Sequence, residues 1–230
     1  MSAEEILGEI RGIFGKKWTT RDGRKVPDTD AITFGNEAVT FIGTVLYADM
    51  ADSTGLVNGF RPWFAAEVYK AYLLGACRVI RAHGGEVTAF DGDRVMAVFL
   101  GEYKNTLAVK TALKINFLVH KTNEIIRATY PTTSYILKQT VGVDVSPLFV
   151  AKTGVRKSND LVWVGRAANY AAKLSALGEP GFSTYITDDV FALLNDEAKY
   201  GGQNNTLMWE RRIWTEKQLP VHRSNWWWSI

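Results

Sequence analysis

The chain has 230 residues, of which 47% are hydrophobic and 22% are charged. This length and composition are typical of a globular protein with a substantial core. The mild net charge of +3 does not demand a nucleic-acid partner, which a dense Lys/Arg stripe usually marks. We therefore expect no nucleic-acid partner, although the mild positive charge suits an anionic ligand such as a nucleotide.

Cysteine usage and the N-terminal residues indicate the compartment. Cys77 is the single cysteine, so no disulfide framework exists and a reducing cytoplasm is the expected location. The first residues are acidic and lack the positive and apolar segments of a signal peptide, and no apolar run approaches the length of a membrane span. We expect a cytoplasmic protein without a membrane partner.

Residues 1–35 are predicted to form an N-terminal arm. A short helix up to about residue 15 places Ile6, Ile10 and Ile13 on one face, and a polar loop follows from Lys16 to Asp30. We interpret residues 36–230 as one domain, since no repeat, low-complexity tract or linker interrupts them.

A buried strand over 41–48 opens this domain and ends at Asp49. A carboxylate at the end of a strand is well placed to hold a hard cation, and the backbone N–H groups of the following Ser53-Thr54-Gly55 turn can cradle phosphate oxygens. Many strands end in Asp, so this pattern alone is weak evidence.

The next elements are a helix over 60–83, two strands over 86–90 and 94–100, and a helix over 104–128. Asp91-Gly92 between the two strands is a strong hairpin signal because both residues tolerate positive φ. Asp93 is therefore predicted at a hairpin tip.

The last third of the chain alternates strands and short helices. We expect a strand over 134–144, which residues 148–153 continue or pair with, and a loop carrying Lys152, Arg156 and Lys157 that leads to residues 160–165. A helix over 166–177, a strand over 182–186, a helix capped at Thr187-Asp188 and a sheet segment over 207–228 follow. This order predicts an α+β protein with a ferredoxin-like core, a mostly antiparallel sheet covered by helices.

Four tryptophans crowd the C-terminus: Trp214, Trp226, Trp227 and Trp228. We interpret them as a final aromatic strand that packs on the core or on a second subunit. The alternatives are an interfacial membrane anchor and a stacking platform for bases.

If the predicted hairpin pairs with the first strand, Asp49 and Asp93 converge at one end of the sheet. Two like charges there would repel unless a cation neutralised them. The functional interpretation is a pair of Mg²⁺ or Mn²⁺ sites for in-line phosphoryl or nucleotidyl transfer. For either residue alone, capping of a strand or turn is the more common role.

Three segments resemble, in order, the motifs of the class III nucleotide cyclases, the family of adenylate and guanylate cyclase catalytic domains. They are residues 45–50 with Thr54 and Gly55, residues 92–99, and residues 165–174. The spacing of Asp49 and Asp93 also fits that family, and three ordered motifs are much more specific than one.

The resemblance implies a two-metal mechanism at the interface of a homodimer. Asp49, Asp93 and the backbone carbonyl of Met50 would hold two divalent cations. Asn169 would orient the ribose, and Lys173, where the family carries Arg, would stabilise charge on the α-phosphate from the opposite subunit. Lys217 is the candidate for the family's late triphosphate lysine, with Arg211 and Arg212 as rivals.

Base choice is implied by the positions that read purines in the family. They hold Ala89 and Val162, which cannot make the polar contacts of an adenine or guanine pocket. Tyr47 and Arg94, beside the metal residues, resemble instead the pyrimidine cyclases of bacterial Pycsar antiphage systems. Core packing of Tyr47 and an exposed strand position for Arg94 are equally plausible roles.

We therefore expect an enzyme that converts UTP to 3′,5′-cyclic UMP and pyrophosphate as an antiphage alarm signal. The alternatives are a CTP cyclase, an adenylate cyclase with an atypical pocket, an inactive cyclase-homology module, and a polymerase-like palm domain. Retention of Asp49, Asp93 and Asn169 together argues against the inactive module, and the Asn169 helix is unexplained by a palm domain.

Overall fold

A computed structural model describes residues 2–155 and 157–230. Met1 and Arg156, which the sequence assigns to the arm and to a loop, lie outside the described residues. The chain divides into two compact units, one made of Met1–Ile42 with Pro147–Gly165 and the other of Gly43–Ser146 with Arg166–Ile230. Strands β2 (Glu37–Met50) and β5 (Gln139–Val155) contribute residues to both units.

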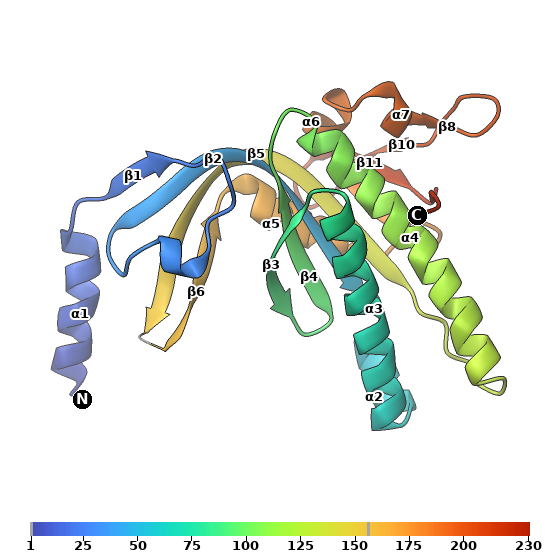
Figure 1. The fold of residues 1–230 in the computed structure, drawn as a ribbon, viewed down its shortest axis with the longest axis horizontal. Helices are drawn as coiled ribbons and strands as arrows, with labels where there is room; N and C mark the ends of the chain where they lie inside the picture. Colours follow the sequence, from blue (N-terminus) through green and yellow to red (C-terminus); the bar gives the residue numbers. More distant parts are fainter. Residues whose placement is uncertain (1, 156) are drawn as a thin grey trace. The chain divides into compact units, whose positions relative to one another are not determined.

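The larger unit is built on a twisted sheet in the order β10-β11-β7-β5-β2-β4-β3 (Figure 1). The remaining bounds are Glu86–Asp91 for β3, Arg94–Phe99 for β4, Thr184–Thr187 for β7, Glu210–Trp214 for β10 and Leu219–Ser224 for β11. The β5–β7 pair is parallel, whereas β2–β4, β3–β4, β7–β11 and β10–β11 are antiparallel. The predicted α+β class and mostly antiparallel sheet are confirmed.

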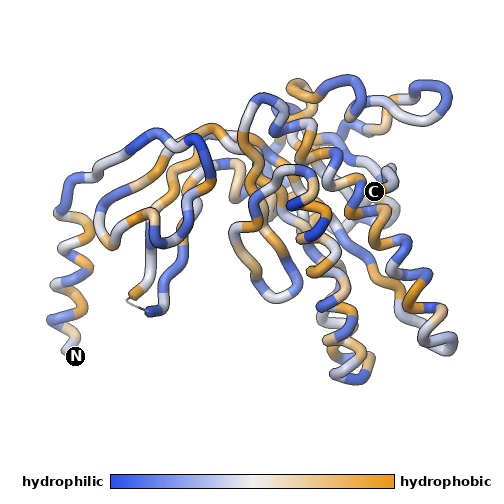
Figure 2. The backbone as a smooth tube through the Cα atoms, in the orientation of Figure 1, coloured by the Kyte–Doolittle hydropathy of each residue, from blue (hydrophilic) through white to orange (hydrophobic). Residues whose placement is uncertain are grey.

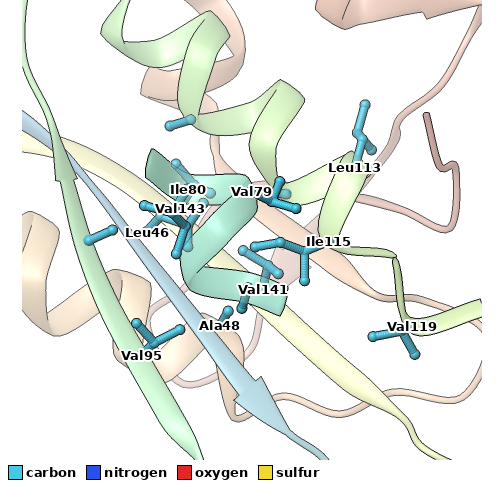
Figure 3. Packing of buried hydrophobic residues seen from close by; sticks show 14 of the residues in the cluster. Leu46, Ala48, Val79, Ile80, Val95, Leu113, Ile115, Val119, Val141 and Val143 are labelled. Carbon is cyan, nitrogen blue, oxygen red and sulfur yellow. The ribbon is translucent and has the colours of Figure 1, made fainter. Parts of the chain in front are cut away.

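Helices α3 (Pro62–Ala82) and α4 (Lys104–Thr129) pack together on one face of this sheet. Figure 3 shows how Val79 and Ile80 of α3 and Ile115 of α4 meet Leu46, Val141 and Val143 of the sheet, all of them buried. Along both helices, hydrophobic and hydrophilic segments alternate in Figure 2, as expected for helices with one buried stripe.

Helix α5 (Arg166–Ser175) covers the opposite face of the sheet. Its Leu174 packs with Tyr185, Trp214 and Val221, whereas Ile186, the next residue of β7, belongs to the core under α3 and α4. Because side chains alternate along a strand, the two clusters lie on opposite sides. The other helices of this unit are α2 (Ser53–Gly59), α6 (Asp188–Ala192) and α7 (Asp196–Lys199), beside a two-stranded sheet of β8 (Tyr200–Gly201) and β9 (Thr206–Leu207).

In the smaller unit, α1 (Ala3–Gly15) is capped at its N-terminus by a capping box between Ser2 and Glu5, and none of its residues is buried. Strand β1 (Thr19–Asp22) pairs in parallel with β2, and a short 3-10 helix, η1, spans Thr29–Ala31. Strand β6 (Ser158–Val164) pairs with the second half of β5. The loop predicted over residues 16–30 therefore contains a strand, and β5 runs on to Val155 where a loop was predicted.

Other predictions about local structure need correction. The opening strand is longer than predicted because β2 also pairs with β1, and Ser53-Thr54-Gly55 is the first turn of α2 instead of an open turn. The strand predicted from residue 134 begins only at Gln139. Residues 226–228 follow the last strand, so they are no aromatic strand, but Trp226 and Trp228 do pack on the core.

No helix among the described residues is long and apolar enough to cross a membrane.

Candidate active site

The structure brings Asp49 and Asp93 together. Strand β2 pairs with β4 so that Asp49 lies opposite Arg94, and the Met50 N–H donates to the carbonyl oxygen of Asp93 at 3.4 Å. Gly92 has a φ of 61°, which lets the β3–β4 turn close tightly and carry Asp93 back to the end of β2. Asp49, Met50 and Asp93, three residues from two separate motifs, therefore meet where β2 ends and β4 begins.

The charges of Asp49 and Asp93 at this end of β2 and β4 favour a cation. Burial, followed by the nearby charge of Asp93, raises the pKa of Asp49 to about 7, while Arg94 opposes the shift. A bound metal ion would stabilise the charged form of Asp49 against both its burial and the nearby charge of Asp93. Among residues 2–155 and 157–230 no three His, Cys, Asp or Glu side chains cluster in a way that could hold a metal. The acids fit a divalent cation if a backbone oxygen such as that of Met50 and substrate oxygens complete its coordination.

A row of side chains beside these acids lies on the sheet face opposite α3 and α4. Tyr47 of β2 is opposite Met96 of β4, and Met96 is in turn opposite Ala89 of β3. Directly paired residues point to the same face. Leu46 and Ala48, which flank Tyr47, belong to the core under the helices, so Tyr47 and Asp49 face the other way.

Arg94 is held at the end of this row by an ion pair with Asp91. This hydrogen bond raises the pKa of Arg94, and the nearby charges of Asp49 and Asp91 contribute to the same shift. The charge of Arg94 also opposes the burial that raises the pKa of Tyr47. Tyr47, Arg94 and Asp49 therefore share one electrostatic environment.

The predicted phosphate turn begins with a residue that the sequence analysis did not single out. Asp52 has a φ of 58° and caps α2, and its carboxylate accepts a hydrogen bond from the Gly55 N–H at 3.1 Å. Ser53 is half-buried and Thr54 is exposed. One of the three N–H groups of the turn is thus already engaged by Asp52.

Helix α5 presents Asn169 and Lys173 on its exposed face, one turn apart, while Ala167, Ala168 and Ala171 are buried. Lys173 forms an ion pair with Glu216 in the turn between β10 and β11. Lys217 approaches the same Glu216 oxygen at 3.3 Å. The two predicted phosphate-binding lysines therefore meet at a single carboxylate.

Val162 lies in the smaller unit, where β6 places it opposite Ala151 of β5. Its side chain is 40% exposed. Arg211 and Arg212, the rivals of Lys217, lie in β10 with exposed side chains that pair with Asp188 and Glu210.

Four residues near the site were missed by sequence reasoning: Asp52, described above, and three others. Asp91 was interpreted only as a turn residue, although an acid three residues before Arg94 is a recognisable pairing signal. Met96 was counted as an ordinary strand residue, and only the strand register reveals its place between Tyr47 and Ala89. Glu216 gave no signal, because its contact with Lys173 joins residues far apart in sequence.

Comparison with known proteins gives close relatives. The chain is 50% identical to the uridylate cyclase of Xanthomonas perforans over 99% of its length and 98% of that protein, and 40% identical to the uridylate cyclase of Burkholderia cepacia over 99% of both chains. The structure of a bacterial light-regulated adenylyl cyclase superposes with a TM-score of 0.68 at 22% identity, over 81% of this chain and 91% of that one. No protein-family model matches.

The fold is that of the class III nucleotide cyclases, and the protein is a nucleotide cyclase. More narrowly, its full-length similarity to proteins of that name shows that the chain belongs to the family of uridylate cyclases. The resemblance inferred from the three sequence motifs is thereby confirmed.

Proposed function

We propose that the protein converts UTP to 3′,5′-cyclic UMP and pyrophosphate. The observation that carries this proposal is the meeting of Asp49 and Asp93 beside the row of Tyr47, Met96 and Ala89, in a chain whose relatives are named uridylate cyclases. In the reaction the ribose 3′-oxygen forms a bond to the α-phosphorus, and the bond from that phosphorus to the β-phosphate oxygen breaks. Its electron pair leaves with pyrophosphate and the hydroxyl proton passes to water.

Asp49, Asp93 and the Met50 carbonyl would hold two divalent cations, Mg²⁺ or Mn²⁺, which supply charge neutralisation on the triphosphate and acidify the 3′-hydroxyl. Asn169 orients the ribose and Lys173 binds the α-phosphate, where negative charge develops. The first turn of α2, residues 53–55, would bind the outer phosphates, whose oxygens would replace the Asp52 carboxylate at the Gly55 N–H, and Lys217 would share that task. Because Lys173 and Lys217 meet at Glu216 in the free protein, triphosphate oxygens must replace that carboxylate as their partner.

The choice of a pyrimidine follows from the size and chemistry of the row. Tyr47 is bulky and Ala89 offers no hydrogen-bond donor, so a purine finds neither space nor the polar partners it needs. The Tyr47 hydroxyl and the Arg94 guanidinium are the polar groups available to the edge of uracil. Val162 holds the second of the two positions that read purines in the family, and its side chain also offers no polar partner. A CTP cyclase is the alternative, and product analysis distinguishes the two.

We further propose that two copies form the enzyme, with Asp49 and Asp93 from one copy and Asn169 and Lys173 from the other. The support is that Asn169 and Lys173 are exposed on α5, that Asp49 and Asp93 are only partly buried, and that neither set alone makes a complete site. Residues 36–230 would form the catalytic domain and residues 1–35 an arm. The product would serve as an alarm signal in antiphage defence. Plaque counts in cells that carry the wild-type or the Asp49→Ala protein test this role.

The experiment is incubation of the purified protein with each of the four ribonucleoside triphosphates and Mn²⁺, followed by mass spectrometry. We expect cyclic UMP from UTP, and no product from the Asp49→Ala variant with an unchanged circular dichroism spectrum. Cyclic CMP as the main product would replace UTP by CTP. Absence of any cyclic product from a dimeric, folded protein would refute the proposal.

The shared site is tested by mixing two inactive variants, Asp93→Ala and Asn169→Ala. A mixed dimer contains one site with all four residues intact, so partial activity should return. Mixed dimers that form and stay inactive would refute the assignment of the residues to opposite copies.

A further inference from the structure

Helix α5 carries Asn169 and Lys173, and most of its buried face is made of small side chains. The buried face consists of Ala167, Ala168, Ala171, Leu174 and Ser175. Alanines allow close approach to the sheet, and Leu174 is the large side chain of this face that interlocks with its neighbours. Because Leu174 lies near the end of α5, contacts at the start of the helix are also needed to fix its rotation.

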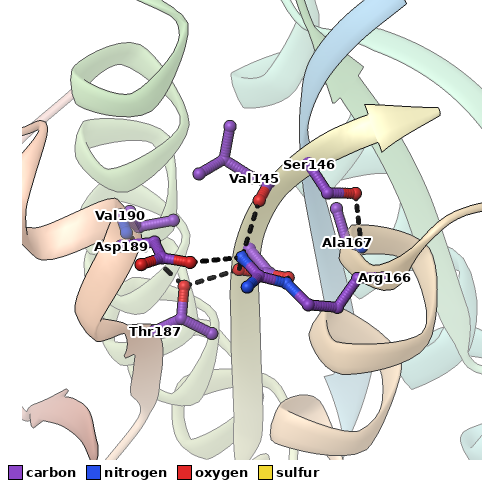
Figure 4. A network of polar contacts seen from close by, with 8 residues as sticks. Val145, Ser146, Arg166, Ala167, Thr187, Asp189 and Val190 are labelled. Atoms are coloured by element: carbon purple, nitrogen blue, oxygen red, sulfur yellow. Dashed lines mark hydrogen bonds and ion pairs between the residues drawn. The ribbon is translucent and has the colours of Figure 1, made fainter.

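Those contacts gather at its first residue, Arg166 (Figure 4). The Nε and Nη2 atoms of Arg166 donate to the two carboxylate oxygens of Asp144 in β5, at 3.0 and 3.1 Å. Nη2 also donates to the carbonyl oxygen of Val145 at 2.9 Å and to Asp189 of α6 at 2.6 Å. This guanidinium thus joins α5 to two other elements in one planar, bidentate geometry.

Neighbouring groups complete the arrangement from both sides. The Thr187 hydroxyl at the end of β7 donates to Asp144 at 2.6 Å, which fixes the carboxylate. The Ala167 N–H at the start of α5 donates to the Ser146 hydroxyl of β5 at 2.9 Å. Arg166 and Ala167 are therefore both tied to the stretch of β5 from Asp144 to Ser146.

The Asp144–Arg166 pair is a costly way to stabilise a fold. The Asp144 side chain is fully buried, and burial raises its pKa although Thr187 and Arg166 favour the charged form. Arg166 is 40% exposed, so the cost of desolvation falls mainly on Asp144, and an ion pair with a buried member is often no more stabilising than a well-packed apolar pair. Geometric specificity is the remaining advantage of the pair.

We propose that Asp144 and Arg166 form a clamp that sets the position of α5, which makes Arg166 a positioning residue for the cyclisation reaction through Asn169 and Lys173. This inference rests on the proposed function. Its consequence is that loss of the clamp damages the α5 half of the active site and leaves the metal half, Asp49 and Asp93, intact.

The first test compares steady-state kinetics of Arg166→Lys, Arg166→Met and the double variant Asp144→Leu/Arg166→Met, with Lys121→Met as the control. A displacement of about 1 Å at a catalytic group can cost about 100-fold in rate. We expect kcat to fall by roughly that factor in Arg166→Met with a much smaller change in KM, and Arg166→Lys to recover part of it. The double variant removes the buried Asp144 charge together with its partner and so leaves no unpaired buried charge; it should fold about as stably as the wild type and still lose kcat. Lys121 forms an exposed ion pair with Glu124 and should leave kcat unchanged when replaced.

The second test uses mixed dimers, with the Asp93→Ala and Asn169→Ala mixture as the reference. The double clamp variant should regain activity with Asp93→Ala, whose α5 is intact, and should gain none with Asn169→Ala, which shares the damaged half. Failure of the reference mixture itself would refute the two-copy proposal on which the inference rests. If the reference regains activity while the clamp variant behaves alike with both partners, or if the double variant keeps wild-type kcat, the clamp is merely structural and the inference is wrong.

Discussion

Replacing Gly142 by alanine tests how closely α5 must approach the sheet. Gly142 lies in β5 opposite Tyr185, with α5 directly above it. A Cβ atom there would lie 2.6 Å from the Ser175 nitrogen and 2.8 Å from the Leu174 Cβ, and would also clash with the Ala171 carbonyl oxygen. Ordinary van der Waals contacts begin near 3.4 Å, and most of these atoms belong to backbone that no rotamer change can move. Helix α5 must therefore retreat by an appreciable fraction of an ångström.

Overpacking of this kind costs about 1–3 kcal/mol of unfolding free energy. For a protein of this size each kcal/mol lowers Tm by about 2–4 °C. Because the same displacement moves Asn169 and Lys173, we expect kcat to fall by one to two orders of magnitude, on the scale given for misplaced catalytic groups. Thermal melts and UTP kinetics measure both effects on one preparation.

The control is Gly8→Ala in α1, where a Cβ atom would have no other atom within 4 Å. Alanine there should favour the helix by up to about 1 kcal/mol and leave kcat unaltered. A Gly142→Ala protein with the Tm and kcat of the wild type would refute the argument that contact between α5 and β5 sets the site.

Three further predictions concern single groups. Tyr72→Phe removes a fully buried hydroxyl without a hydrogen-bond partner among the described residues. Urea denaturation should therefore show an equal or greater free energy of unfolding, and a decrease above about 1 kcal/mol would reveal a hydrogen bond to that hydroxyl. Burial lowers the pKa of His222 although Asp188 opposes the shift, so the unfolded chain binds the proton more readily. Stability should therefore fall as pH drops through the ordinary value of 6.5 toward the folded pKa, and His222→Phe should flatten that part of the pH profile of Tm. A profile as steep as that of the wild type would show that other groups cause it. Glu216→Gln removes the carboxylate that Lys173 and Lys217 share, so KM for UTP should fall a few-fold, whereas a raised KM would mean that Glu216 positions the lysines for the substrate.

Many secondary-structure elements of this protein could be predicted from local sequence. The hairpin at Asp91-Gly92 depends on turn chemistry, and the long helices depend on side-chain periodicity. The cap at Thr187 depends on a hydrogen bond that the Val190 N–H donates to its hydroxyl, and all three features involve residues close in the chain. The meeting of Asp49 and Asp93 could be anticipated because a tight hairpin has few ways to join the preceding strand. The α+β class and the cyclase family followed from the order of these elements and motifs.

Tertiary structure alone decided the remaining features. Sequence cannot give the register that aligns Tyr47 with Met96 and Ala89, since a slip of one residue would turn each side chain to the opposite face. The clamp of Asp144 and Arg166, and the sharing of Glu216 by two lysines, join residues distant in the chain through side-chain geometry that no local pattern encodes. The sequence by itself thus indicated the chemical groups of the proposed site, through short-range preferences and motifs. Long-range packing decided how those groups face one another, because it depends on the whole set of neighbours at once.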